Sequence, residues 1–173
     1  MKLTKTIALT AATLMAVTTA FASELPGSAD KITFHSTVEG WNVFSDAERE
    51  ACYVERSDDT GHVVQVGLTK NKKHGYLGVF TLADMKIKKK EKFDVDINGF
   101  TFDGKARGMK SKKLQGDYRG AYYVIKDDNM ANALMQEGTM TVFPKKKEAF
   151  QVDLTGLNAA VEEAKACTAA MSS

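Results

Sequence analysis

The sequence predicts an all-β fold, either β-sandwich-like or an open barrel, with two short α-helices, one of them C-terminal. Three observations carry this prediction. Most segments alternate apolar and polar side chains with the period of two that a half-buried strand requires. Polar turn segments separate these stretches, and only two regions, residues 127–138 and 156–173, show helical spacing instead.

The first 22 residues predict a secretory signal peptide. The basic start MKLTK precedes an uncharged stretch, and the small-x-small site AFA ends at Ala22. A membrane anchor is the weaker alternative, because the stretch is shorter than the roughly 20 residues that a spanning helix needs. We expect cleavage between Ala22 and Ser23 and release into the periplasm or the medium. Residues 23–173 then form a single β-rich domain, since no linker or internal repeat divides them.

Ten segments show strand alternation. The predicted strands cover residues 31–36, 41–45, 51–57, 62–69, 76–82, 92–97, 100–106, 118–126, 139–144 and 149–155. The only tryptophan, Trp41, lies beside Val43 in the second of these strands, and we expect it to be a core anchor.

The segment FDVDINGFTF predicts a β-hairpin, because Asn-Gly between alternating residues is the strongest short-range hairpin signal. A two-residue turn over Asn98 and Gly99 sets the register and sends one apolar face to the core. The expected cross-strand pairs are Ile97 with Phe100, Asp96 with Thr101, Val95 with Phe102, Asp94 with Asp103, Phe93 with Gly104, and Lys92 with Lys105.

The same segment matches the first half of a calcium-binding EF-hand loop. The twelfth position of that loop requires a bidentate glutamate, and here it is Lys105. The EF-hand motif is therefore incomplete, and we expect no metal site here. Weak calcium binding by Asp94 and Asp103 is the alternative that stays open.

Two helices are expected among these strands. The first begins at Asp127 or Asp128, which are suitable N-caps, and ends at Gly138. The second is the C-terminal helix, on which one stripe faces the body of the protein. This stripe comprises Leu157, Ala160, Ala164, Cys167 and Met171.

Cys52 and Cys167 are the only cysteines, and an exported chain meets an oxidising compartment. A disulfide between them is the first expectation, and closing so long a loop would contribute roughly 4 to 5 kcal/mol to stability. Two free buried thiols, or one reactive thiol, are the alternatives. No Cys-x-x-Cys pair supports redox catalysis.

The charges are segregated rather than in excess. The whole chain has 24 basic and 22 acidic residues, and the two signal-peptide lysines account for the difference, so residues 23–173 are neutral. Global basicity thus gives no reason to expect nucleic acid as a partner. Lysines gather most densely in MKIKKKEKF, at Lys86, Lys88, Lys89, Lys90 and Lys92.

This lysine segment has two interpretations. On a strand, four of its lysines share one face, which would attract a polyanionic glycan or an anionic glycolipid. Lysines on an edge strand also protect against edge-to-edge aggregation, and we favour this commoner use.

No motif indicates an enzyme or a cofactor. His35, His62 and His74 lie in three segments without ligand-like spacing, and no nucleophile elbow or phosphate-binding glycine loop occurs. We therefore expect no catalytic residues, no metal and no cofactor.

The order of these parts resembles the invasion-associated locus B family of small exported bacterial proteins. The resemblance lies in a leader, Gly40-Trp41-x-Val43, Cys52-Tyr53-Val54, the hairpin, and the tail NMANALMQEGTMTVFP followed by FQVDLTGLNAAVEEAKAC. Members often carry a further mid-chain cysteine pair, which is not found near residues 117–126. The resemblance implies an exported β-rich protein of the cell envelope, associated in some bacteria with host colonisation and virulence. It supplies no catalytic residues.

Two functions follow as expectations. The first is a non-enzymatic periplasmic or envelope accessory or binding protein whose partner is an unknown protein or envelope component. The second is a secreted inhibitor or a polyanion-binding or glycolipid-binding module that works through the lysine segment. Neither expectation includes nucleic acid or a transmembrane segment in the mature form.

Overall fold

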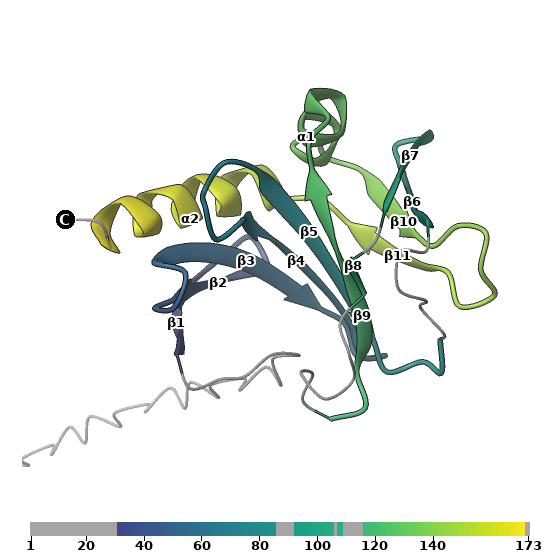
Figure 1. The fold of residues 1–173 in the computed structure, drawn as a ribbon, viewed down its shortest axis with the longest axis horizontal. Helices are drawn as coiled ribbons and strands as arrows, with labels where there is room; N and C mark the ends of the chain where they lie inside the picture. Colours follow the sequence, from purple (N-terminus) through teal and green to yellow (C-terminus); the bar gives the residue numbers. More distant parts are fainter. Residues whose placement is uncertain (1–30, 86–91, 106, 109–115, 172–173) are drawn as a thin grey trace, which may run out of the picture.

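The computed structural model describes residues 31–85, 92–105, 107–108 and 116–171. The predicted signal peptide and its cleavage site lie outside these residues. The described chain is mostly strand, arranged in two antiparallel sheets with two helices, one of them C-terminal (Figure 1). The predicted fold class, all-β and sandwich-like with two helices, is confirmed.

The larger sheet has seven strands in the order β1-β2-β3-β4-β5-β9-β8. Its strands are β1 (Ile32–Val38), β2 (Trp41–Asp46), β3 (Ala51–Ser57), β4 (His62–Leu68), β5 (Gly75–Thr81), β9 (Arg119–Ile125) and β8 (Arg107–Gly108). The first five follow one another through short turns. One such turn is held by Asp46, whose Oδ1 accepts hydrogen bonds from the backbone N–H groups of Glu48 and Arg49.

The smaller sheet has four strands in the order β11-β10-β6-β7. They are β11 (Phe150–Asp153), β10 (Thr139–Val142), β6 (Lys92–Ile97) and β7 (Phe100–Lys105). The β6–β7 hairpin has every predicted cross-strand pair, from Ile97 opposite Phe100 to Lys92 opposite Lys105. Asn98 and Gly99 both have positive φ, as this two-residue turn requires.

One part of the hairpin prediction is wrong. Val95 and Ile97 are buried, but Phe100 is 69% exposed, so the apolar face does not reach the core along its whole length. Phe100 follows the turn directly and lies in β7, which is the edge strand of the smaller sheet. Nothing in the described chain covers that position.

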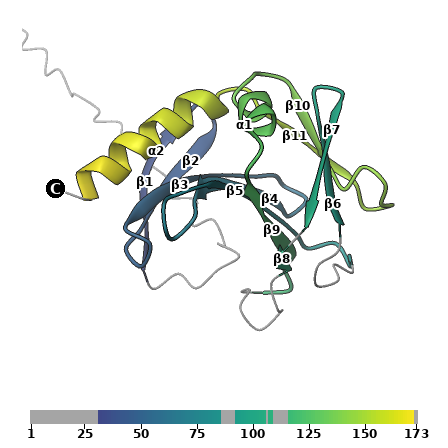
Figure 2. The same cartoon turned by 45° about the horizontal axis from the view of Figure 1, so that its top comes forward.

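Both helices lie on the same side of the seven-stranded sheet (Figure 2). α1 (Asp128–Leu134) begins at the predicted N-cap, where the Asp127 side chain accepts a hydrogen bond from the Asn129 backbone N–H. It ends at Leu134, earlier than predicted: its C-cap is Met135, and Gln136 and Glu137 follow before Gly138.

α2 (Leu157–Met171) covers β1, β2 and β3 near the C-terminus (Figure 2). Four of the five residues of the predicted stripe, Leu157, Ala160, Ala164 and Cys167, are buried. Met171 is the exception at 36% exposure, because it lies in the last turn of the helix.

One hydrophobic core joins the two sheets and the two helices. It includes Trp41 of β2, Leu77 of β5, Ile97 of β6, Leu134 of α1 and Leu157 of α2. The Trp41 side chain is fully buried, and its indole Nε1 donates a hydrogen bond of 3.0 Å to the Thr155 carbonyl oxygen. Trp41 is therefore the core anchor that the sequence predicted.

Cys52 of β3 and Cys167 of α2 form the predicted disulfide, with their Cα atoms 5.9 Å apart and a sequence separation of 115. A second contact supports the bond, because the Cys52 backbone N–H donates a hydrogen bond of 2.8 Å to Thr168 Oγ1. The C-terminal helix is thus fixed to the centre of the sheet by a covalent and a polar contact.

Candidate pocket and polar cluster

A pocket of about 360 Å³ lies between the seven-stranded sheet and the two helices. Its walls come from the β4–β5 hairpin, from the junction of β9 with α1, and from one face of α2. This volume falls within the range of known small-molecule sites, which is about 300 to 1,000 Å³. The pocket is a concave feature of the described ranges, and it is the candidate binding site.

Most of the pocket surface is apolar. Val66 of β4 and Ile125 of β9 come from the sheet, Leu134 from α1, and Val161 and Ala164 from α2. Strand alternation points Val66 and Ile125 toward the helices, and the helical spacing of Val161 and Ala164 places both on the face toward the sheet.

Small residues keep the pocket open. Gly75 and Ala131 contribute little or no side chain to the wall. A Cβ added at Gly75 would have its nearest contact, the Ile125 Cδ1 atom, at 3.5 Å, which is ordinary van der Waals contact. Larger side chains at these positions would occupy space that a ligand could fill.

The charged residues of the pocket lining are all exposed to solvent, and together they are called its mouth here. Three lysines come from three different walls: Lys73 from the β4–β5 turn, Lys126 from the β9–α1 junction, and Lys165 from α2. The two carboxylates, Asp127 and Asp128, both belong to the β9–α1 junction.

Some of these mouth groups already have a hydrogen-bond or ion-pair partner, and others do not. Lys165 Nζ lies 2.6 Å from Glu162 Oε1, and Asp127 caps α1. For Lys73 and Lys126, no hydrogen bond or ion pair of the ammonium group links them to another residue in the described parts of the chain.

The disulfide adjoins the pocket. Cys52 and Thr168 both line it, and Thr168 Oγ1 accepts from the Cys52 backbone while donating to the Ala164 carbonyl oxygen at 2.8 Å. The covalent bond therefore holds the α2 wall at its distance from the sheet wall.

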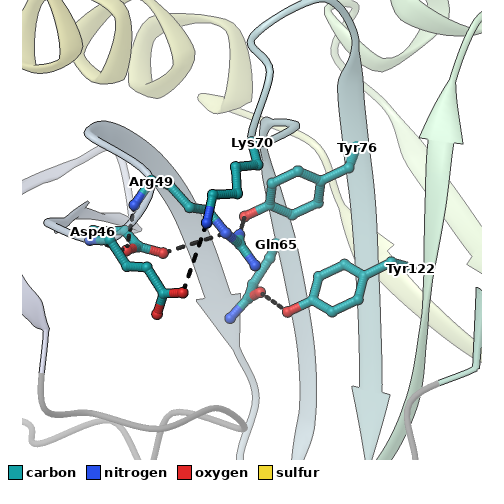
Figure 3. Close-up of polar contacts among 7 residues, drawn as sticks. Asp46, Arg49, Gln65, Lys70, Tyr76 and Tyr122 are labelled. Carbon is teal, nitrogen blue, oxygen red and sulfur yellow. Dashed lines mark hydrogen bonds and ion pairs between the residues drawn. The ribbon is translucent and has the colours of Figure 1, made fainter.

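A second arrangement of polar side chains lies on the opposite face of the seven-stranded sheet (Figure 3). The Arg49 guanidinium lies 5.4 Å from the centre of the Tyr76 ring and 6.0 Å from that of Tyr122. Its Nη1 donates a hydrogen bond of 3.2 Å to the Tyr76 hydroxyl, and its Nε lies 3.4 Å from Asp46 Oδ2. Arg49 is thus held by an aromatic pair and a carboxylate together.

A row of residues crosses this face from β3 to β9. Glu55 is opposite Gln65, Gln65 is opposite Gly78, and Gly78 is opposite Tyr122. Gln65 Nε2 donates a hydrogen bond of 2.7 Å to Glu55 Oε2, and the Tyr122 hydroxyl donates one of 3.3 Å to Gln65 Oε1. Tyr122 reaches Gln65 by crossing Gly78, where a Cβ would lie 2.8 Å from the ring.

In the neighbouring row on each side, a strand glycine again makes room for an aromatic ring. Gly67 makes room for the Tyr53 and Tyr76 side chains, and Gly120 makes room for the ring of Phe80. Three glycines inside strands therefore let an aromatic layer lie close to the sheet.

Burial raises the pKa values of Tyr53, Tyr76 and Tyr122 above the ordinary tyrosine range, and neighbouring acidic groups add to the rise. Tyr53 has a buried hydroxyl with no hydrogen-bond partner among the described residues. The hydrogen bonds described above join residues of this cluster to one another, which is the pattern of a structural network.

The structure brings together one of the two predicted sets of site residues. Cys52 and Cys167 are bonded, as expected. Of the lysine segment, Lys86, Lys88, Lys89 and Lys90 lie outside the described residues, and Lys92 lies in β6 opposite Lys105. The anion-binding hypothesis for this segment stays a prediction.

The three histidines occupy separate places. His35 Nε2 lies 3.1 Å from Glu163 Oε1, His62 stacks on Phe150 and contacts Thr81 Oγ1, and His74 lines the pocket. Within the described ranges, no three His, Cys, Asp or Glu side chains lie close enough together to hold a metal ion.

Sequence reasoning missed both the pocket and the polar row. The pocket walls come from three distant segments, so no local pattern could reveal them. The polar row had a signal, because Gln65 interrupts an otherwise apolar strand and Gly78 and Gly120 lie inside strands.

Comparison with family models, with curated proteins and with solved structures finds no match. No helix in the described parts of the chain has both the length and the apolar character needed to cross a membrane. The resemblance to the invasion-associated locus B family therefore stays a prediction.

Proposed function

We propose that this chain is an exported, non-enzymatic binding protein of the bacterial cell envelope, which holds a small apolar molecule in the pocket between its sheet and helices. The observation that carries the proposal is the pocket itself, with its volume of about 360 Å³, its apolar walls and its polar mouth. Small-molecule sites in proteins commonly combine these three properties.

Two features support export to the periplasm or beyond. The chain begins with a signal-peptide pattern that ends at Ala22, and its two cysteines form a disulfide. Structural disulfides persist in oxidising compartments and are rare in the cytosol. The resemblance to the invasion-associated locus B family fits the same location.

Binding requires that the apolar walls remain open in the folded protein. Gly75, Ala131 and Ala164 leave space between larger apolar residues. The disulfide fixes one wall to the other, so the pocket does not close by movement of α2. A preformed apolar site binds its ligand without a large ordering cost.

Binding of the neutral dye N-phenylnaphthylamine tests the proposed function. We expect the protein to enhance its fluorescence at one site, and we expect Ala131→Phe to abolish the enhancement by filling the pocket. Asn132→Phe is the matched control, because Asn132 is exposed on the same helix and does not line the pocket. Equal dye binding by both variants, with both folded by circular dichroism, would refute the proposal.

An intact mass of the protein from the envelope fraction tests export. We expect a chain that begins at Ser23, is two hydrogens lighter than the dithiol, and takes up alkylating reagent only after reduction. A chain that keeps Met1 and has two freely alkylated thiols would contradict export.

A further inference from the structure

We propose that the molecule held in the pocket is a single-chain amphiphile with an acid headgroup, such as an alkyl carboxylate. The alkyl chain of the ligand would lie among the apolar walls, and its acid group would lie at the lysine-bearing mouth. This inference rests on the proposed function, because it names the chemical class of the ligand for the same pocket.

The apolar part of the ligand follows from the depth of the pocket. Leu134 is 1% exposed or less and lines the wall of the pocket, together with Val66 and Ile125 from two strands. Polar groups lie at the surrounding turn, junction and outer helix face instead. A ligand that is polar throughout would lose its hydration against these walls without gaining hydrogen bonds.

The acid group follows from the charges at the mouth. Each of the three walls contributes one lysine, which is Lys73, Lys126 or Lys165. The two carboxylates, Asp127 and Asp128, come from one wall only. An anion held between the walls would therefore face cations on every side and carboxylates on one.

Some of the charged groups at the mouth already have partners. Asp127 is committed to the cap of α1, and Lys165 is paired with Glu162. Lys73 and Lys126 flank the paired ends of β5 and β9, and neither ammonium group has a partner in the described parts of the chain. The cap hydrogen bond leaves the negative charge of Asp127 in place, so the charged lining comprises three lysines and two aspartates. The balance at the mouth favours a negative headgroup over a positive one.

A homologous series of alkyl carboxylates tests the inference by displacement of the neutral dye, below the concentration at which micelles form. We expect affinity to rise about fourfold for each added methylene until the pocket is full. We also expect dodecanoate to bind about three- to tenfold more tightly than dodecanol, and dodecylammonium to bind more weakly than either.

Removing the charges of two mouth lysines tests whether these residues bind the acid group. Lys73→Gln with Lys126→Gln should lower dodecanoate affinity about three- to tenfold and leave dodecanol affinity unchanged. Lys70→Gln with Lys147→Gln is the matched control, because it makes the same change of net charge at exposed positions outside the pocket. Equal losses in both variants would assign the effect to net charge and overturn the inference.

The outcomes separate the inference from the function on which it rests. If dye and dodecanol bind but dodecanoate has no advantage, the pocket is a binding site and the acid headgroup is wrong. If neither dye nor any alkyl compound binds, the proposed function fails as well.

A final experiment tests whether the ligand is a free monomer or a membrane lipid. Vesicles of phosphatidylglycerol and of phosphatidylcholine present acyl chains within a membrane, whereas dodecanoate is a free monomer. We expect the protein to bind dodecanoate without floating with either vesicle, since a pocket of this volume holds one short chain. Flotation with phosphatidylglycerol alone, competed by dodecanoate, would assign the same site to an anionic membrane lipid.

Discussion

Cys167 of the C-terminal helix is bonded to Cys52 at the centre of the seven-stranded sheet, and Cys52 also lines the pocket. One bond therefore stabilises the fold and sets the distance between two walls of the candidate site. The hydrogen bond from the Cys52 backbone to Thr168 acts at the same place. Stability and ligand binding should consequently change together when this link is broken.

The double variant Cys52→Ala/Cys167→Ala should lose about 2 to 5 kcal/mol of unfolding free energy, because its unfolded state is no longer restricted by the 115-residue loop. Urea denaturation measures the loss, and dye binding should weaken in the same variant. Met171→Ala is the control, because the Met171 sulfur contacts Cys52 but its side chain is partly exposed. If removing the cysteines costs no more than removing Met171, the bond has no structural role.

The buried tyrosines predict a loss of stability at alkaline pH. Burial raises the pKa values of Tyr53, Tyr76 and Tyr122 in the folded chain, whereas unfolded tyrosines titrate near pH 10. Above about pH 10 the folded state therefore binds more protons than the unfolded state, and the unfolding free energy falls as the pH rises. Below that pH these tyrosines should contribute no pH dependence.

Urea denaturation at pH 8, 9.5 and 11, together with tyrosinate absorbance, measures this effect. We expect most tyrosine ionisation to coincide with the loss of the near-ultraviolet circular dichroism signal. Full ionisation near pH 10 with the fold intact would show that these hydroxyls are open to solvent.

Phenylalanine substitutions at Tyr53 and Tyr76 test what each hydroxyl contributes to stability. Tyr76→Phe removes a hydrogen bond from the Arg49 guanidinium and should cost about 1 to 2 kcal/mol. Tyr53→Phe removes a buried hydroxyl that has no partner among the described residues, and should be neutral or slightly stabilising. Urea denaturation compares the two variants at pH 7. The reverse order of stability would mean that the hydroxyl of Tyr53 is bonded in solution.

Gly78 tests the close packing of the polar row. Gly78→Ala places a Cβ 2.8 Å from the Tyr122 ring, so the ring must shift away from Gln65, and we expect a loss of about 1 to 3 kcal/mol. Gly75→Ala on the same strand meets only ordinary contacts, and it should be neutral or gain up to about 1 kcal/mol. Thermal unfolding distinguishes the two variants. Equal effects would mean that strand propensity, not the crossing ring, decides the cost.

Local patterns predicted the strands, the hairpin register and the disulfide because each depends on few residues. Asn98-Gly99 fixes its turn through backbone conformation alone, and alternation then assigns every cross-strand pair. Two cysteines permit only one pairing. The error at Phe100 has the opposite cause, since its exposure depends on what packs against the smaller sheet, which no local pattern contains.

The end of α1 and the pocket were less predictable for a related reason. Gly138 is a suitable helix stop, but the helix ends at Leu134, whose side chain belongs to the common core of the two sheets. The pocket requires the register of β4, the spacing of α2 and the course of the β9–α1 junction at the same time. Only the assembled fold places Lys73, Lys126 and Lys165 around one opening.

The lysine segment provides the test of the alternative function. If the proposed function is right, the pocket binds its ligand without these lysines. The triple variant Lys88→Glu/Lys89→Glu/Lys90→Glu should then leave dodecanoate binding unchanged. Its retention on heparin should fall only as much as that of Lys110→Glu/Lys112→Glu/Lys113→Glu, which has the same net charge. Chromatography over a salt gradient measures both, because contacts with a polyanion weaken as salt screens them. A selective loss in the first variant would instead favour a polyanion-binding module that works through this segment.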